Sequence, residues 1–337
     1  MKYARYILAI LLIGIVIVVL TLNKGEGPYV SIAGFTQGTT YHITYQSPGE
    51  DSLDLQDAVN ALLAEFDQSL STYIDTSNIS RINNNETDRT DAYFETVYRE
   101  AKRIYELSNG AFDITVGPLR DAWGFGPGVK MEMSEKVIDS LMQFVGMDKL
   151  SLENGKITKE HPEMLIDVNA IAQGYAVDVV CEFLEDLRIK NYMVEIGGEL
   201  RTKGLSPRND TWRVGIDKPF YGNQQPGQEL QAVVNLSGKA LASSGNYRKY
   251  YEVDGKKIVH TIDPLTGYTR MSNLLSITII SDECITADAL ATTCMALGFE
   301  KAVEFIESQE NVEALFIYTD EDGLYLEWMT DGMKELL

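Results

Sequence analysis

An apolar run near the amino terminus divides this chain into two unequal parts. Residues 6–22 read YILAILLIGIVIVVLTL, 17 residues without a charge, and Lys2 and Arg5 precede them. A helix that crosses a bilayer needs about 17–25 residues, whereas the apolar region of a secretory signal peptide has about 7–15 and ends in an A-x-A-like site. The length therefore favours an uncleaved membrane anchor over a cleaved signal peptide, and we assign residues 1–27 to this segment. The preceding basic residues favour a cytoplasmic amino terminus, with the rest of the chain outside the cytoplasm.

Residues 28–337 are expected to fold as one continuous domain. The chain is 45% hydrophobic and 23% charged, which is a globular composition, and no internal repeat or proline-rich linker divides it. Its formal charge of −21 argues against binding to a nucleic-acid backbone, which requires clustered Lys and Arg. The same charge means that a phosphate-bearing ligand needs local help from a helix N-terminus or a metal ion.

Several common catalytic and metal-binding signatures do not occur. The three cysteines form no CxxC pair, so a zinc ribbon or a thioredoxin-like site is unsupported. The three histidines form no HExxH, and neither GxSxG nor GxxxxGK[ST] is present. The usual signatures of a zinc protease, a serine hydrolase and a P-loop NTPase are therefore lacking.

Hydrophobic periodicity predicts helices and antiparallel strands in alternation along the domain. The predicted helices are residues 53–70, 94–108, 134–145, 170–187, 287–297 and 302–308. The predicted strands are 31–46, broken near Gln37-Gly38, then 192–196, 212–216, 232–236 and 275–280, with hairpins at 249–262 and 314–329. This mixture indicates the α+β class, as a single compact mixed α/β catalytic domain with antiparallel sheet elements.

The segment Asp167 to Ala176, DVNAIAQGYA, reads as a strand end that passes into a helix. Asn169 is a plausible N-cap and Gly174 lies in the first turns, so an anion could approach the helix N-terminus closely. The alternative is structural: Asn169 only caps the helix, and Gly174 only lets it pack.

A second segment, ITADALAT at residues 285–292, places two oxygen ligands on one helix face. With Thr286 as N-cap, Asp288 lies in the first turn and Thr292 one turn later on the same side. Together they offer hard oxygens to a cation such as Mg²⁺. The alternative is that Asp288 only complements the helix dipole.

Four further segments are individually weak. His260 precedes the turn sequence Asp-Pro-x-Thr-Gly, and a histidine on a strand is more often structural than catalytic. Residues 242–248, ASSGNYR, read as a polar loop that could hold phosphate or simply turn. The Gly-containing loops at 196–199 and 109–115 would let a planar ligand approach the backbone, although an ordinary turn explains them equally well.

Taken in order, these segments resemble one family. The series is GTTY (38–41), SLSTY (69–73), NGAFDITVGPL (109–119), DVNAIAQGYAVD (167–178), EIGGE (195–199), ASSGNYR (242–248), HTIDPLTG (260–267) and TADALATT (286–293). It resembles the FAD:protein FMN transferases, or ApbE-like flavin transferases, from about Gly34 to the last hairpin. Eight collinear motifs make a chance resemblance very improbable.

The resemblance implies an activity and its partners. Such enzymes cleave FAD at the pyrophosphate and pass FMN to a Thr or Ser hydroxyl of a target protein, releasing AMP. The targets are typically membrane-associated redox subunits, so the implied location is the bacterial inner membrane, attached through residues 6–22, with the catalytic domain on the periplasmic side. A flavin-storage protein that only binds FAD, and an FAD pyrophosphatase that yields FMN and AMP, are the alternatives.

The resemblance also implies roles for particular residues. Asp288, Thr292 and the backbone carbonyl of Ala170 correspond to Mg²⁺ ligands, and Asp288 and His260 correspond to residues at the reacting centre. The corresponding FAD contacts are Tyr73 at the isoalloxazine ring, Ala111, Phe112 and Asp113 at the adenine end, and Gln37, Asp167, Gln173 and Thr261 elsewhere on FAD. Two of these depart from the family pattern, because Gln37 stands where Met is frequent and Gln173 where Lys or Glu is frequent. A neutral Gln173 can donate a hydrogen bond but supplies no charge to a phosphate.

Overall fold

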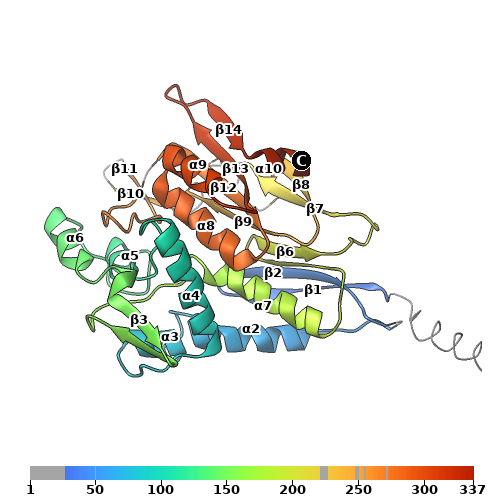
Figure 1. Ribbon diagram of the computed structural model, residues 1–337, viewed down its shortest axis with the longest axis horizontal. Coiled ribbons are helices and arrows are strands. Elements are labelled where there is room, and N and C mark those ends of the chain that lie inside the picture. Colours follow the sequence, from blue (N-terminus) through green and yellow to red (C-terminus); the bar gives the residue numbers. More distant parts are fainter. Residues whose placement is uncertain (1–26, 50, 221–226, 247–249, 254–255, 271) are drawn as a thin grey trace, which may run out of the picture.

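The computed structural model describes residues 27–337 except 50, 221–226, 247–249, 254–255 and 271 (Figure 1). The apolar run at residues 6–22 therefore lies outside the described residues. Within the described part, no helix has the length and apolar content needed to cross a bilayer.

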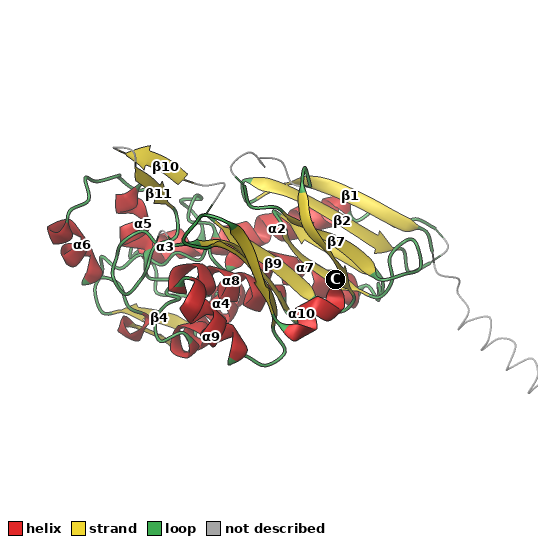
Figure 2. Cartoon of the chain, turned by 90° about the horizontal axis from the view of Figure 1, so that it is seen from above, coloured by secondary structure: helices red, strands yellow, loops and turns green. Residues whose placement is uncertain are grey.

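An eight-stranded sheet forms the centre of the domain (Figures 1 and 2). In spatial order its strands are β1 (Tyr29–Thr36), β2 (Thr39–Gln46), β5 (Tyr192–Ile196), β6 (Glu199–Lys203), β9 (Ala240–Gly245), β12 (Leu274–Ser281), β13 (Glu313–Thr319) and β14 (Tyr325–Met329). Every neighbouring pair is antiparallel. The predicted α+β class with antiparallel elements is thus confirmed.

Helices and three separate hairpins complete the described fold. The helices are α2 (Gln56–Leu70), α3 (Asn78–Asn83), α4 (Ala92–Leu107), α5 (Gly117–Trp123), α6 (Glu135–Met142), α7 (Ala172–Asp186), α8 (Cys284–Leu297), α9 (Phe299–Glu307) and α10 (Asp331–Leu336), with a 3₁₀ turn at Met147–Lys149. The hairpins pair β3 (Leu150–Glu153) with β4 (Lys156–Lys159), β7 (Trp212–Asp217) with β8 (Leu230–Leu236), and β10 (Tyr250–Val253) with β11 (Lys256–Val259).

The central strands of the sheet are buried on both faces. On one face, Ile277 and Ile279 of β12 belong to the large core that also contains residues of α7 and α8. On the other, Ile280 of β12 and Ile317 of β13 pack in a second core with residues of β7, β8 and α10. Strands covered on both sides carry nearly continuous apolar runs, and the sequence ITII at 277–280 has that character. The sheet therefore provides a rigid base for α7 and α8.

The turn between β1 and β2 forms where the sequence predicts it. Gln37 and Gly38 have φ values of 50° and 73°, and a two-residue turn with both φ positive matches the right-handed twist of the flanking strands. Beside it, a Cβ on Gly34 would lie 2.7 Å from the ring of Tyr41. Only glycine leaves room for that ring, whose hydroxyl donates to Asn60 of α2 over 2.6 Å.

Two predicted helix starts are wrong. α7 begins at Ala172, with Ile171 as N-cap, so Asn169 lies in the preceding turn. α8 begins at Cys284, three residues before the predicted start, which places Thr286 inside the helix. The Thr286 hydroxyl donates instead to Glu100 of α4 over 2.7 Å. In both helices a distant carboxylate replaces the local cap.

The segment at 242–248, interpreted above as a polar loop, is also different in the structure. Its first four residues belong to β9, which lies between β6 and β12. The hydroxyls of Ser243 and Thr278 are 2.8 Å apart across β9 and β12, so a polar side chain is accommodated within the sheet. Residues 247–249, and residues 254–255 within the predicted hairpin at 249–262, lie outside the described residues.

Candidate functional site

The N-terminal turns of α7 and α8 meet at Asp288. This carboxylate is 6% exposed, and its Oδ2 accepts a hydrogen bond from the backbone N–H of Gly174 at 2.9 Å. Gly174 is the third residue of α7, so its N–H is one of the donors that have no partner within the helix. Asp288 thus lies in the positive field of the α7 N-terminus.

Close packing at this junction requires glycine. A Cβ on Gly174 would lie 2.3 Å from the carbonyl oxygen of Cys284 and 2.7 Å from Cβ of Asp288. Both obstacles belong to the first turn or two of α8 and cannot swing away, since one is backbone and the other begins a side chain. The two helix N-termini therefore approach more closely than any side chain at position 174 would permit.

The electrostatics of Asp288 fit a cation. Burial raises the pKa of this carboxyl to about 7, although the hydrogen bond from Gly174 opposes the shift. Among the described residues, Oδ1 accepts no hydrogen bond, so one oxygen remains for a metal. Half-buried Thr292 follows one helical turn later, and half-buried Ala170 lies in the turn before α7. Hydroxyl, carbonyl and carboxylate oxygens are the donors that Mg²⁺ prefers.

No cluster of three or more His, Cys, Asp or Glu side chains suitable for a metal occurs among the described residues. A site made from one carboxylate, one hydroxyl and one main-chain carbonyl would not form such a cluster. The chemistry of the predicted ligands, Asp288, Thr292 and the Ala170 carbonyl, therefore fits a hard divalent ion that retains other ligands from substrate or water, as Mg²⁺ does.

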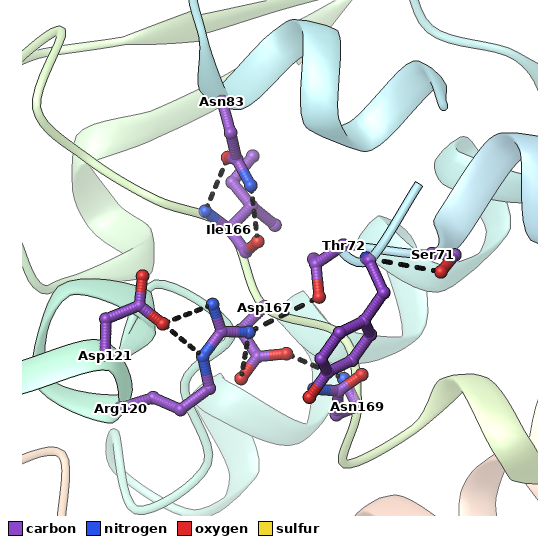
Figure 3. A network of polar contacts seen from close by, with 9 residues as sticks. Ser71, Thr72, Asn83, Arg120, Asp121, Ile166, Asp167 and Asn169 are labelled. Carbon is purple, nitrogen blue, oxygen red and sulfur yellow. Dashed lines mark hydrogen bonds and ion pairs between the residues drawn. The ribbon is translucent and has the colours of Figure 1, made fainter. Parts of the chain in front are cut away.

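A second polar cluster surrounds Arg120 of α5 (Figure 3). Its Nη1 lies 3.0 Å from Oδ2 of Asp167, and its Nη2 lies 2.7 Å from Oδ1 of Asp121. Nη1 also donates to the hydroxyl of Thr72 at 3.5 Å. Burial opposes the charged guanidinium, but the two carboxylates outweigh it, so the pKa of Arg120 is raised. The guanidinium thus offsets the charge of one of the two carboxylates, and the cluster keeps a formal charge of about −1.

Asp167 is further fixed by its own neighbours in the chain. Its Oδ1 accepts from the backbone N–H of Asn169 at 3.0 Å, as Figure 3 shows. The preceding residue, Ile166, exchanges two hydrogen bonds with the side chain of Asn83 over 2.8 and 2.9 Å. Tyr73, next to Thr72, is 63% exposed. An exposed ring beside a rigid polar cluster is a suitable contact for a planar ligand.

Gln37 lies in the β1–β2 turn, and Gln173 is the second residue of α7. Gln37 donates to Oδ1 of Asp67 at 3.3 Å, and burial raises the pKa of that carboxyl although the Gln37 hydrogen bond lowers it. A Cβ on Gly197 would lie 2.0 Å from Nε2 of Gln173 and 2.9 Å from Cγ2 of Thr39. The Gly197-Gly198 turn thus brings the amide of Gln173 against the start of β2.

The predicted adenine-end segment is mostly internal. Ala111 and Phe112 are buried, and Phe112 belongs to the main core. Asp113 accepts from the N–H and hydroxyl of Thr115 at 2.7 and 2.6 Å and from the N–H of Met147 at 3.1 Å. Burial raises the pKa of Asp113 to about 6, although these hydrogen bonds oppose the shift. Its carboxylate therefore ties two loops together.

His260 and Thr261 lie at the end of β11. The rings of His260 and Phe125 have their centroids 6.4 Å apart at an interplanar angle of 69°, an edge-to-face contact. The Thr261 hydroxyl donates to Oδ1 of Asn246 at 2.8 Å. Downstream in the same loop, Leu265 approaches the 109–113 segment, since a Cβ on Gly110 would lie 3.1 Å from its Cδ2.

The structure thus groups the predicted residues only in part. Asp288 meets the Gly174 end of α7, and Asp167 joins the Arg120 cluster next to Tyr73, whereas Asp113 faces inward. Sequence reasoning missed Arg120 and Asp178, two buried charges in apolar surroundings. Asp178 stands among three valines in AVDVV, and a charge inside such a run was the available signal.

Comparisons with known proteins agree with this architecture. A solved structure of the flavin transferase ApbE from Vibrio cholerae superimposes with a TM-score of 0.82 at 35% identity, covering 93% of this chain and 100% of that chain. The FAD:protein FMN transferase of Vibrio cholerae serotype O1 is 37% identical over 315 residues, 91% of this chain and 92% of the relative. That of Haemophilus influenzae is 37% identical over 327 residues, 92% of this chain and 94% of the relative.

The fold is thus that of the flavin-transferase class of protein. The ApbE family model matches residues 37–316. The chain belongs to the ApbE family, which confirms the resemblance found in its motifs.

Proposed function

We propose that this chain is a Mg²⁺-dependent FAD:protein FMN transferase that acts on a Thr or Ser hydroxyl. The observation that carries the proposal is the buried carboxylate of Asp288 at the meeting point of two helix N-termini. Such a position combines negative charge for a cation with main-chain N–H groups for an anion. A pyrophosphate with its metal ion requires both.

The reaction exchanges one phosphoester partner for another. The acceptor hydroxyl oxygen bonds to the FMN-side phosphorus of FAD, and the bond from that phosphorus to the bridging oxygen breaks. AMP leaves with the bridging oxygen, and the hydroxyl proton passes to Asp288 or His260 as base. No oxidant or reductant is consumed.

Asp288, Thr292 and the Ala170 carbonyl would hold the Mg²⁺, which supplies positive charge to the pyrophosphate and the departing AMP. The chain itself contributes the field of the α7 N-terminus, whose first-turn donors point toward this position. Such local help matters because the overall charge of −21 repels a dinucleotide.

Other residues would bind the two ends of FAD. Tyr73 would contact the isoalloxazine ring, with Gln37, Gln173, Asp167 and Thr261 as polar contacts. Ala111, Phe112 and Asp113 are buried. We therefore propose that the backbone of their loop lines the adenine end of FAD. The exposed ring of Tyr73 supports the first of these assignments.

Residues 28–337 would form the catalytic domain, and residues 6–22 would anchor it to the bacterial inner membrane on the periplasmic side. The apolar, uncharged character of that run supports the proposal. An anchored enzyme would meet membrane-bound acceptors, so we propose a subunit of a membrane redox complex as the natural target.

The test is a transfer assay with the purified full-length chain, FAD, Mg²⁺ and a peptide that carries a single Thr. The expected product is a peptide heavier by one FMN phosphoester, together with AMP, and none of it forms in the presence of EDTA. The matched control is the same peptide with Val in place of Thr, which removes only the hydroxyl. FMN and AMP with an unmodified peptide would indicate a pyrophosphatase, and intact bound FAD would indicate a storage protein.

A further inference from the structure

The N-terminal turns of α7 and α8 are capped by each other's carboxylates. Neither N-cap residue, Ile171 or Glu283, makes a side-chain capping bond. Instead, the N–H of Gly174 in α7 donates to Asp288 of α8 at 2.9 Å. The N–H of Ile285 in α8 donates to Oδ2 of Asp178 in α7 at 2.8 Å. Each helix therefore supplies the partner that the other lacks at its first turn.

The two hydrogen bonds and the two helix turns join these four residues in a closed circuit of contacts. Gly174 and Asp178 are one turn apart on α7, and Ile285 and Asp288 are about one turn apart on α8. The contact between Gly174 and the Cys284 carbonyl closes the space between the two helices. Moving either helix along its axis would break both hydrogen bonds together, so the position of Asp288 depends on the bond made by Asp178.

Asp178 also connects this circuit to the sheet. Its Oδ1 lies 2.8 Å from Nη1 of Arg201, on β6 between β5 and β9. The carboxylate is 3% exposed, and its two oxygens are divided between Arg201 and the N–H of Ile285. A buried carboxylate with both oxygens engaged in this way has one orientation.

We propose that Asp178 is a positioning residue for the transfer site. Acting through the N–H of Ile285, it holds the first turn of α8 in the register that presents Asp288 and Thr292 to the α7 N-terminus. Asp178 touches neither substrate nor metal in this scheme. The inference rests on the proposed function, because it assigns a task to the same pair of oxygen ligands.

The test compares two double variants that differ only in the hydrogen-bond acceptor. Arg201→Met with Asp178→Asn (the Asn pair) keeps an oxygen for the N–H of Ile285. Arg201→Met with Asp178→Leu (the Leu pair) removes that oxygen. Neither double variant leaves a buried unpaired charge. Asp186→Asn, an exposed charge change at the end of α7, is the control. The readout is Mn²⁺ binding to the protein–FAD complex, from the paramagnetic resonance of free Mn²⁺, with FAD alone as blank.

The Asn pair should bind Mn²⁺ within about threefold of the native chain, and the Leu pair at least about tenfold more weakly. Asp186→Asn should bind as the native chain does. Equal affinities of the Asn and Leu pairs, whether both native-like or both weakened, would overturn the proposal. So would a native chain that binds no Mn²⁺.

If thermal melting shows that the Leu pair does not fold, the Mn²⁺ affinity of the single variant Asp178→Glu tests the proposal instead. It keeps the charge and the partner Arg201 but pushes the carboxylate one methylene toward α8, so Mn²⁺ affinity should fall at least fivefold. Unchanged affinity would contradict the proposal. A native chain that binds Mn²⁺ yet modifies no peptide would refute the transferase and leave this inference standing, so the two failures are distinguishable.

Discussion

The two polar clusters of this molecule, around Arg120 and around Asp288, differ in whether their carboxylates have a cationic partner. Around Arg120, one guanidinium is shared by the carboxylates of Asp167 and Asp121, and nearly every polar atom has a charged or hydrogen-bonding partner. Around Asp288, one buried carboxylate has a single main-chain donor. In the first cluster the chain itself supplies a cation to the carboxylates, and among the described residues the second has none.

The difference suggests different tasks for the two clusters. Carboxylates paired with a buried guanidinium fix the backbone around them and have little attraction left for a metal cation. Burial of a carboxylate that has no cationic partner raises its pKa, and an added cation stabilises its charged form. A metal-dependent transfer site requires such a carboxylate. Under the proposed function, the Arg120 cluster would hold the flavin side of the site in shape, and Asp288 would take part in the reaction.

The largest effect is expected from Asp288→Asn. The amide keeps an oxygen for the N–H of Gly174 but loses the charge that would hold the cation, worth about 3 kcal/mol or more of transition-state stabilisation. Peptide flavinylation should fall at least about a hundredfold while the melting temperature is maintained or rises. Asp186→Asn is the matched control. Transfer within threefold of native by Asp288→Asn would sink the metal-site assignment.

Arg120→Met should disrupt the Arg120 cluster. It leaves the carboxylates of Asp167 and Asp121 in place without their shared cation, and removing one partner of a buried ion pair costs about 3–5 kcal/mol. Urea denaturation measures this loss. Arg103→Met, which removes a guanidinium with a 48% exposed side chain from its pair with Glu100, should cost about 0.5 kcal/mol. Similar losses in both variants would mean that burial does not distinguish the pairs.

Gly174→Ala tests how closely the helices must approach. The added methyl meets the Cys284 carbonyl, so α7 and α8 must separate, at a cost of about 1–3 kcal/mol. Because the reacting groups shift with the helices, we expect roughly a tenfold or greater loss of kcat. Single-turnover kinetics with saturating FAD would measure it. A fully active Gly174→Ala enzyme would show that the junction tolerates a wider spacing.

An effect that appears only as a pH dependence of stability is expected at Asp113, a buried carboxylate with three donors. Its folded pKa of about 6 lies above the unfolded value of 3.8, so the stability it contributes is present below about pH 4 and lost as pH rises through 6. Relative to the non-titrating variant Asp113→Asn, native stability should fall by up to about 3 kcal/mol between pH 4 and pH 7. Denaturation at several pH values provides the curve, and a constant difference would rule out this titration.

Much of the fold could be predicted because its signals are local. The β1–β2 turn follows from Gln37-Gly38, and the α4 end at Leu107 follows from Asn109 and Gly110, both with positive φ. The starts of α7 and α8 could not be predicted in this way. Local capping rules select Asn169 and Thr286, but the donors are satisfied by Asp288 and Asp178 from the other helix.

The site shows the same division. Asp288 and Thr292 share a helix face, so their proximity follows from helical spacing alone. The association of Arg120 with Asp167 and Thr72 joins residues 47 and 48 positions apart, and no spacing rule encodes it. The carboxylate of Asp113 accepts hydrogen bonds from Thr115 and from Met147, and the second of these also joins distant parts of the chain.

The reciprocal capping of α7 and α8 also sets the order in which the molecule can be completed. Its two hydrogen bonds join residues 114 and 107 positions apart, so a long stretch of chain must close before either forms. Contacts of such separation form late in folding, because their loop entropy is recovered only after local structure exists. The junction of α7 and α8 therefore cannot form until nearly 290 of the 337 residues have been synthesised. Any truncation upstream of α8 yields a product that lacks Asp288, the carboxylate proposed to act in the transfer.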